Sequence, residues 1–179
     1  MQHLLILVII LVVTGLSFLL IKWPGSLNKT FSQHAAATKW SKIYYSLLFI
    51  VTLPLLFLYI LDWLVPTKNL PNAFLWFAVI AVTFQILCTF FPEEGNPNAK
   101  IHRILTGISG IAMLPLVAII ALSPTVSTFA SVLAWLSLTF MLVLLGIALT
   151  HQKGFKWALL LQVGYYAAFF TVLLSVTYS

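Results

Sequence analysis

Five side chains of the kinds that bind metal ions or transfer protons lie in the few polar segments of this chain. They are His34, Glu93, Glu94, His102 and His151. Imidazoles combined with carboxylates form the ligand sets of zinc, iron and manganese sites. The same two groups exchange protons near neutral pH, because an imidazole titrates there. These residues are far apart in the sequence, so shared chemistry requires a fold that brings their segments together.

The composition indicates that this fold lies in a membrane. Of the 179 residues, 62% are hydrophobic and 7% are charged, whereas about 25% are charged in typical soluble domains. Nine basic and three acidic residues cannot cover a soluble domain of this size. The apolar content also excludes a disordered chain, and the single cysteine excludes an intramolecular disulfide scaffold. We therefore expect an integral membrane protein.

Six apolar stretches are long enough to cross a membrane, which takes roughly 20 residues of helix for a hydrocarbon core of about 30 Å. They cover about 4–21, 43–61, 73–91, 104–122, 126–150 and 157–178, and none contains Lys, Arg, Asp or Glu. Their apolar residues are continuous rather than alternating, which favours helices over strands. The sequence predicts an all-α polytopic membrane protein, a six-helix transmembrane bundle that forms a single domain over residues 1–179.

The basic residues predict the orientation of this bundle. Six spans place the segments 22–42, 92–103 and 151–156 on one side, and these hold eight of the nine basic residues, with Lys68 alone on the other side. Basic segments stay in the cytoplasm, so both termini are expected outside. The charge then serves topology and contact with anionic lipids, and no nucleic-acid partner is needed to explain a pI near 9.6.

Four of the chemistry-bearing residues, from all three of these segments, form a predicted set of ligands for a divalent metal ion. They are His34, Glu94, His102 and His151. The alternative is that they are ordinary polar residues at the membrane surface, since a histidine at a helix end is often an interfacial or capping residue. The sequence contains no short-spaced metal motif, so both interpretations stay open here.

A second candidate set would bind a polar ligand at the same face. Gln85 and Gln162 lie within two of the spans, each about 9 Å below the cytoplasmic interface at a rise of 1.5 Å per residue. Buried amides in a membrane need hydrogen-bond partners, and these two could serve helix packing or line a polar cavity. The set consists of Gln85, Glu93, Glu94, Arg103 and Gln162.

The chain resembles the bacterial and archaeal integral membrane proteins grouped as domain-of-unknown-function family 998. The resemblance rests on Phe90-Phe91-Pro92-Glu93-Glu94, on His102 with the small residues that follow it, and on Ser32-Gln33-His34 before the second span. It covers nearly the whole chain. It implies a six-helix bundle with no established activity, and it groups Pro92, Glu94 and His102.

Three functions are compatible with these patterns. The first is a bacterial inner-membrane protein without a demonstrated enzymatic role, whose cytoplasmic face carries a polar pocket for a metal ion or an anionic lipid headgroup. The second is a lipid-modifying membrane hydrolase that uses a metal-bound water, which requires at least three protein ligands on one ion. The third is a structural or assembly subunit whose polar segments dock a partner. The distances among the candidate side chains discriminate between them.

Overall fold

The computed structural model describes residues 1–91, 93, 96–150 and 156–179, and all regular structure in these ranges is helical. Six helical stretches in them are long and apolar enough to cross a membrane, which confirms the predicted all-α six-helix bundle. The protein is therefore a multi-pass membrane protein. The long helices are α1 (Gln2–Lys22), α3 (Lys39–Tyr59), α5 (Asn72–Thr89), α6 (Asn96–Leu122), α7 (Thr128–Thr150) and α8 (Ala158–Tyr178).

Two of these helices extend beyond the apolar stretches that predicted them. After α3 the chain continues through a π-helical turn, η1 (Ile60–Leu64), and the short α4 (Val65–Thr67), so the second span passes Asp62 without a break. Helix α6 begins at Asn96, in a polar segment. A helical backbone satisfies its own hydrogen bonds whatever its side chains are. The helix therefore continues into the polar interface, whereas hydropathy predicts that it ends where the apolar residues end.

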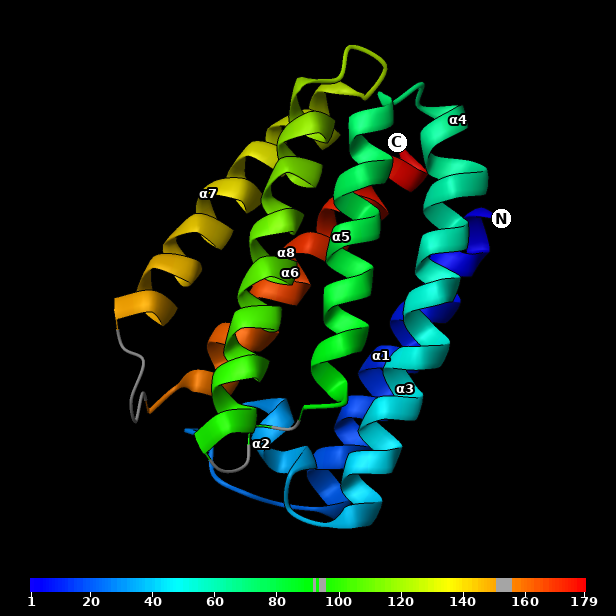
Figure 1. Ribbon diagram of the computed structural model, residues 1–179. Helices are drawn as coiled ribbons and strands as arrows, with labels where there is room; N and C mark the ends of the chain where they lie inside the picture. The colour runs from blue at the N-terminus through cyan, green and yellow to red at the C-terminus, as the bar shows by residue number, and fades with distance from the viewer. Residues whose placement is uncertain (92, 94–95, 151–155) are drawn as a thin grey trace.

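A short helix, α2 (Phe31–Ala35), lies between the first two spans, where the sequence predicts only a polar segment. Its start is a capping box: the Thr30 side chain accepts a hydrogen bond from the Gln33 backbone N–H, and the Gln33 side chain accepts one from Thr30 N–H. This reciprocal pair stabilises the first turn. Helix α2 packs against α1 and α3, at one end of the bundle (Figure 1).

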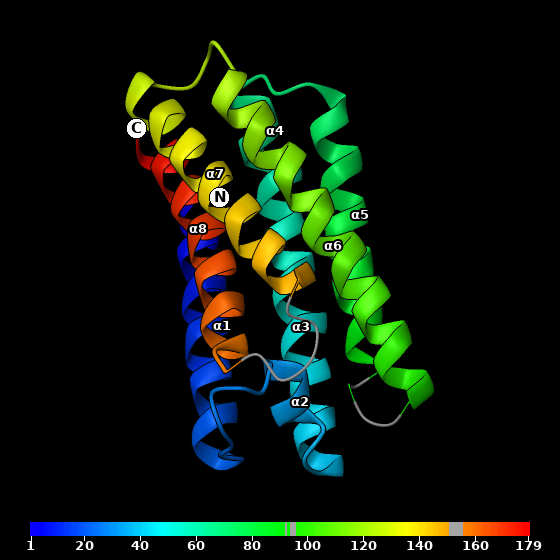
Figure 2. The same cartoon turned by 90° about the vertical axis from the view of Figure 1, so that its left-hand side faces the viewer.

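The long helices form a closed arrangement. Helix α3 packs against α1 and α5, α6 packs against α5 and α7, and α8 packs against α7 and also reaches α1 and α6. Figures 1 and 2 show the bundle from two sides, with both termini toward the end opposite α2. The buried interior is apolar throughout much of its length, while large apolar side chains such as Trp76 and Phe129 point outward. These outward side chains are suited to contact with lipid chains.

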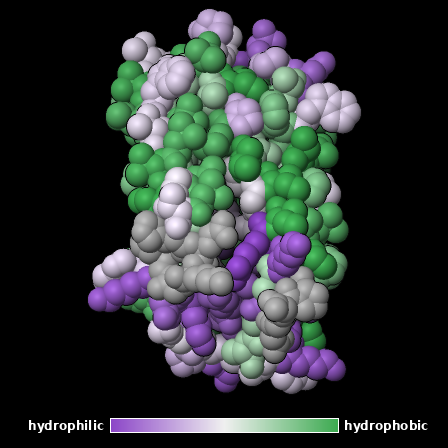
Figure 3. All heavy atoms as spheres, turned by 60° about the vertical axis from the view of Figure 1, so that its left-hand side comes forward, coloured by the Kyte–Doolittle hydropathy of each residue, from purple (hydrophilic) through white to green (hydrophobic). Residues whose placement is uncertain are grey.

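The basic residues gather at the end of the bundle that carries α2, which we call the basic end. In the described part of the chain it holds Lys22, Lys29, Lys39, Lys42, Lys100, Arg103 and Lys156, whereas Lys68 lies in the connection between α4 and α5 at the opposite end. Lys153 lies outside the described residues. Figure 3 shows a hydrophobic band across the middle of one face, with hydrophilic side chains gathered in its lower part and a few at its upper edge.

Candidate functional site

A cavity of about 380 Å³ lies at the basic end, between α6, α7 and α8. We call it the basic-end pocket. One side is apolar and is formed by Leu144, Leu145 and Leu149 of α7 and Leu161 of α8. The other side is polar, and its residues come from the segment around α2, from Glu93, and from α6 and α8. The polar residues are Thr30, Ser32, Glu93, His102, Arg103, Thr106, Gln162, Tyr165 and Tyr166.

Glu93 is the centre of the polar side. Its Oε1 lies 2.9 Å from Arg103 Nε. Its Oε2 accepts hydrogen bonds from the hydroxyls of Thr30, at 3.1 Å, and Ser32, at 3.4 Å. The Glu93 side chain is 9% exposed, whereas that of Arg103 is 52% exposed. One carboxylate therefore joins the capping box of α2 to the first turns of α6, and it orients the guanidinium of Arg103 at the pocket.

Gln162 connects α8 to the same short helix. Its Oε1 accepts a hydrogen bond of 3.0 Å from the backbone N–H of Phe31, a donor at the first position of α2 that has no partner within that helix. Gln162 also lines the basic-end pocket, together with Tyr166 one helical turn later. Both sequence-based interpretations of this residue therefore apply: it joins helices and it lines a cavity.

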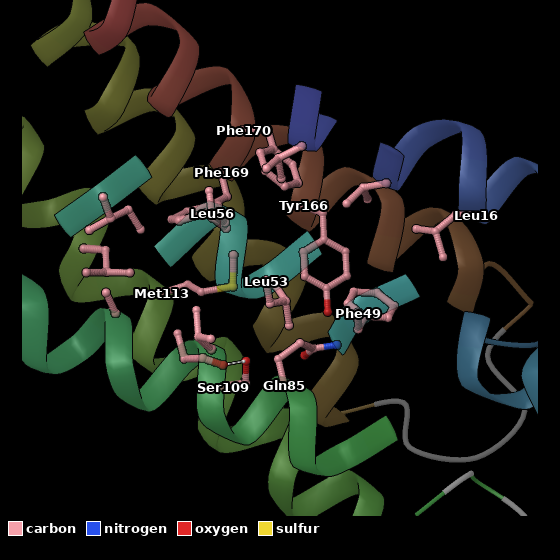
Figure 4. A pocket seen from close by; sticks show the side chains of 17 residues that line it. Leu16, Phe49, Leu53, Leu56, Gln85, Ser109, Met113, Tyr166, Phe169 and Phe170 are labelled. Atoms are coloured by element: carbon pink, nitrogen blue, oxygen red, sulfur yellow. Dashed lines mark hydrogen bonds between the residues drawn. The ribbon is translucent and has the colours of Figure 1, made fainter. Parts of the chain in front are cut away.

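Gln85 occupies a different place from Gln162, although the sequence puts the two at the same depth. It is 5% exposed, and it lines a smaller apolar cavity of about 50 Å³ inside the bundle. Figure 4 shows its side chain beside the Tyr166 hydroxyl. Its Oε1 is buried and has no hydrogen-bond donor among the described residues. Gln85 is therefore separate from the group around Glu93.

His102 connects α6 to the end of α5. The imidazole is 4% exposed, and its Nδ1 lies 2.9 Å from the Phe91 carbonyl oxygen and 3.0 Å from that of Cys88. Carbonyl oxygens only accept hydrogen bonds, so Nδ1 carries a hydrogen, and in the neutral ring Nε2 holds the lone pair. His102 also contributes to the lining of the basic-end pocket.

His34 lies apart from the pocket, between the end of α1 and α2. It is 3% exposed, and its Nδ1 lies 3.3 Å from the Trp23 carbonyl oxygen. Its Nε2 is buried and has no hydrogen-bond partner in the described chain. The ring packs against Gly25, where a Cβ atom would lie 2.5 Å from His34 Cε1. His34 is not among the residues that line the pocket.

The predicted metal set is only partly described by the structure. Glu94 and His151 lie outside the described residues. Within the described ranges, no three His, Cys, Asp or Glu side chains come together in a group that could hold a metal ion. A metal site that uses Glu94 and His151 with His102 stays a prediction.

Several pocket residues were not singled out by the sequence patterns. Thr30, which lines the pocket, stands three residues before Gln33, the spacing of a capping box, and this is a signal for the start of α2 that a search for apolar runs does not use. Tyr166 follows Gln162 by one helical turn, so the two side chains share a helix face. The apolar wall on α7 has no comparable signal, because that helix is apolar on every side and its pocket-facing residues cannot be told from its lipid-facing ones.

Comparisons of the chain with protein-family models, with curated proteins and with solved structures found no match. The resemblance to domain-of-unknown-function family 998 stays a prediction from the motifs that suggest it.

Proposed function

We propose that this protein binds an anionic single-chain amphiphile in the basic-end pocket. Its phosphate or carboxylate headgroup would contact Arg103, and its apolar chain would lie along Leu145 and Leu149 of α7. One observation carries the proposal: the same cavity has a polar side centred on the Arg103–Glu93 pair and an apolar side built from α7 and α8. A ligand that satisfies both sides has a charged head and an apolar tail.

The size of the pocket supports a ligand of this kind. Small-molecule sites are clefts of about 300–1,000 Å³ with mainly apolar walls and a few placed polar groups, and the basic-end pocket has about 380 Å³. That volume suits a headgroup with part of one chain. Arg103 donates Nε–H to Glu93, and its terminal nitrogens carry the remaining donors of a fork that matches phosphate and carboxylate oxygens.

The charge of the basic end supports an anionic headgroup. Seven described Lys and Arg residues lie there, against the carboxylate of Glu93. Basic residues next to a membrane attract anionic lipids with about 1 kcal/mol each. By the same distribution we propose that the basic end faces the cytoplasm of a bacterial inner membrane, with both termini outside. Membership of the 998 family belongs to this proposal as well.

The proposed site is tested by a substitution that places a larger side chain in the basic-end pocket. A Cβ built on Gly107, which lines the pocket in α6, meets no described atom within 4 Å, and the same is true of Gly146 in α7, which does not line it. Leucine is a better helix former than glycine by about 1 kcal/mol, so Gly107→Leu and Gly146→Leu should both fold. We would measure the binding of decyl phosphate to each protein in dodecyl maltoside by native mass spectrometry.

Gly107→Leu is expected to lose at least tenfold in affinity for decyl phosphate, and Gly146→Leu is expected to bind like the wild type. Arg103→Gln should weaken binding by about tenfold, because a hydrogen bond to a charged group contributes about 1.5 kcal/mol or more. Lys39→Gln, which changes a basic residue outside the pocket, serves as its control. Equal affinities of the two glycine variants would overturn the proposed site.

A divalent metal ion is the second candidate ligand, and the tautomer of His102 favours it. Metal-binding histidines commonly hold a carbonyl or carboxylate with one ring nitrogen and present the other to the ion, and His102 holds two carbonyls with Nδ1. The hydrolase hypothesis depends on this ion, which would supply the attacking water. Elemental analysis of the purified protein and of a His102→Ala, His151→Ala double variant tests it. Equal, negligible metal in both would exclude the metal site.

A further inference from the structure

A second cavity lies inside the bundle, separate from the basic-end pocket. It has a volume of about 50 Å³, and it is enclosed by α1, α3 with η1, α5, α6 and α8. Figure 4 shows its lining, which is almost entirely aliphatic or aromatic. Its polar members are Gln85, Ser109 and Tyr166; the Ser109 hydroxyl is already bonded to the Ala81 carbonyl oxygen at 2.9 Å. The mainly apolar lining suits an apolar group.

Tyr166 is the one described residue that lines both cavities. Gln162 lines the basic-end pocket with it, and Gln85 lines the interior cavity with it. In Figure 4 the hydroxyl points toward the Gln85 amide, and Phe169 and Phe170 lie on the next turn of the same helix. The phenol ring is therefore a shared wall of the basic-end pocket and the interior apolar cavity.

The polar contacts of this wall are incomplete. The amide of Gln85 faces the Tyr166 hydroxyl, yet its Oε1 is buried and has no donor in the described chain. A buried acceptor without a donor costs free energy, and the Oε1 of Gln85 makes no hydrogen bond that would hold the phenol ring in place. The ring can turn between discrete rotamers about its side-chain torsions, and it belongs to the lining of both cavities.

We propose that Tyr166 determines how long an apolar chain the protein accepts. With the ring in place, a chain whose headgroup is at Arg103 ends in the basic-end pocket. With the ring turned, the chain continues toward Met113 and Leu53, which line the interior cavity. This inference rests on the proposed function, because the chain belongs to the amphiphile bound there, and it adds a specificity-determining residue to that site.

The test is a series of alkyl phosphates of increasing chain length, measured in dodecyl maltoside by native mass spectrometry. The wild type, Tyr166→Ala and Tyr166→Leu are compared with Phe129→Ala, which removes an aromatic ring that faces outward at the opposite end and lines neither cavity. Affinity rises by about fourfold for each methylene group that enters an apolar site. The ratio of variant to wild type at each length removes the effect of partition into the micelle.

For the wild type and Phe129→Ala, affinity is expected to stop rising once the chain fills the pocket. For Tyr166→Ala it should continue to rise, so that the ratio of variant to wild-type affinity is at least tenfold higher for the longest chains than for the shortest. Tyr166→Leu should show the same trend with a smaller gain, and it covers the case in which the alanine variant does not fold. If both variants stop at the wild-type length, the role of Tyr166 is refuted and the pocket stands. If the wild type binds no alkyl phosphate of any length, both proposals fail.

Discussion

Replacing His102 with alanine tests whether this residue holds the end of α5 to α6. Its Nδ1–H serves the carbonyl oxygens of Phe91 and Cys88 in an almost fully buried setting. A buried acceptor left without its donor costs about 1–3 kcal/mol. The Cys88 oxygen also accepts the Phe91 backbone N–H at 3.2 Å, so it keeps one partner and the cost falls in the lower half of that range. We expect His102→Ala to lower the free energy of unfolding by about 1–2 kcal/mol.

Two further substitutions separate the hydrogen bond from the volume of the ring. The side-chain nitrogen of asparagine lies where His102 Nδ1 lies, whereas that of glutamine corresponds to Nε2. Histidine and asparagine have similar helix propensities, so His102→Asn should retain most of the stability and His102→Gln should lose about as much as His102→Ala. Alanine favours a helix by about 0.5 kcal/mol more than histidine. The loss of stability measured for His102→Ala therefore underestimates the contribution of the His102 side-chain contacts.

Unfolding in mixed micelles with increasing denaturing detergent, followed by far-ultraviolet circular dichroism, gives the midpoint for each variant. The measurement is repeated after exhaustive treatment with a chelator. If a bound metal ion stabilises the protein through His102, the chelator should lower the stability of the wild type and leave that of His102→Ala unchanged. If His102→Asn is as unstable as His102→Ala, the assignment of the hydrogen to Nδ1 is wrong.

Three other predictions concern the fold and its orientation. Gly25→Ala should destabilise the protein by about 1–3 kcal/mol, because its Cβ would lie 2.5 Å from the ring of His34. Gly146→Ala should stabilise it by about 0.5–1 kcal/mol, because alanine favours a helix and its Cβ meets no described atom within 4 Å. Detergent-induced unfolding measures both changes. Tyr59 and Thr177 share a buried hydrogen bond of 2.6 Å between α3 and α8, and a double-mutant cycle of Tyr59→Phe and Thr177→Val should give a coupling of about 0.6 kcal/mol, with a value near zero counting against the contact. A reporter that is active only in the cytoplasm should be silent at the C-terminus and active when inserted after Lys29, and the reverse pattern would invert the topology.

The course of the chain through the membrane could be predicted from the sequence, because it depends on properties that add along the chain. An apolar run of about 20 residues has few alternatives to a spanning helix, and the predicted runs match α1, α5, α7 and α8 closely at both ends. Where a boundary differs, as at Asp62 or Asn96, the helix continues in the polar interface and hydropathy carries no signal. The gathering of basic residues at one end follows from the same count of spans.

The contacts of the candidate site could be predicted only in part. The sequence correctly places Arg103, Glu93 and Gln162 at one end of the bundle, but it does not show that Glu93 binds Thr30 or that Gln162 binds the Phe31 backbone. Those contacts join segments that only the packing of the bundle brings together. Gln85 shows this limit most directly. Its depth in the membrane follows from its distance to the helix end. Which neighbouring helices its side chain faces depends on the rotation of α5 about its axis, and that rotation can be predicted only from an amphipathic pattern, which uniformly apolar helices lack.

Glu93 separates the two candidate ligands by the sign of its effect. Its carboxylate pairs with Arg103 at 2.9 Å on the wall of the basic-end pocket, so it competes with an anionic headgroup for the guanidinium and repels it. In Glu93→Gln the amide oxygen still accepts from Thr30 and Ser32. The amide nitrogen then faces Arg103 Nε–H as a second donor, so the guanidinium loses its partner and the negative charge is gone.

Removing that charge relieves about 1 kcal/mol of repulsion in a partly exposed pocket, which corresponds to about fivefold tighter binding of decyl phosphate. A divalent cation responds in the opposite direction, since the loss of a nearby carboxylate weakens its binding. Parallel titrations of wild type and Glu93→Gln with decyl phosphate and with Zn²⁺ therefore distinguish the two proposals. Tighter binding of decyl phosphate supports the amphiphile. Unchanged decyl phosphate binding together with weaker Zn²⁺ binding refutes it in favour of the metal, because a headgroup at Arg103 cannot be insensitive to the only carboxylate paired with that residue in the described chain.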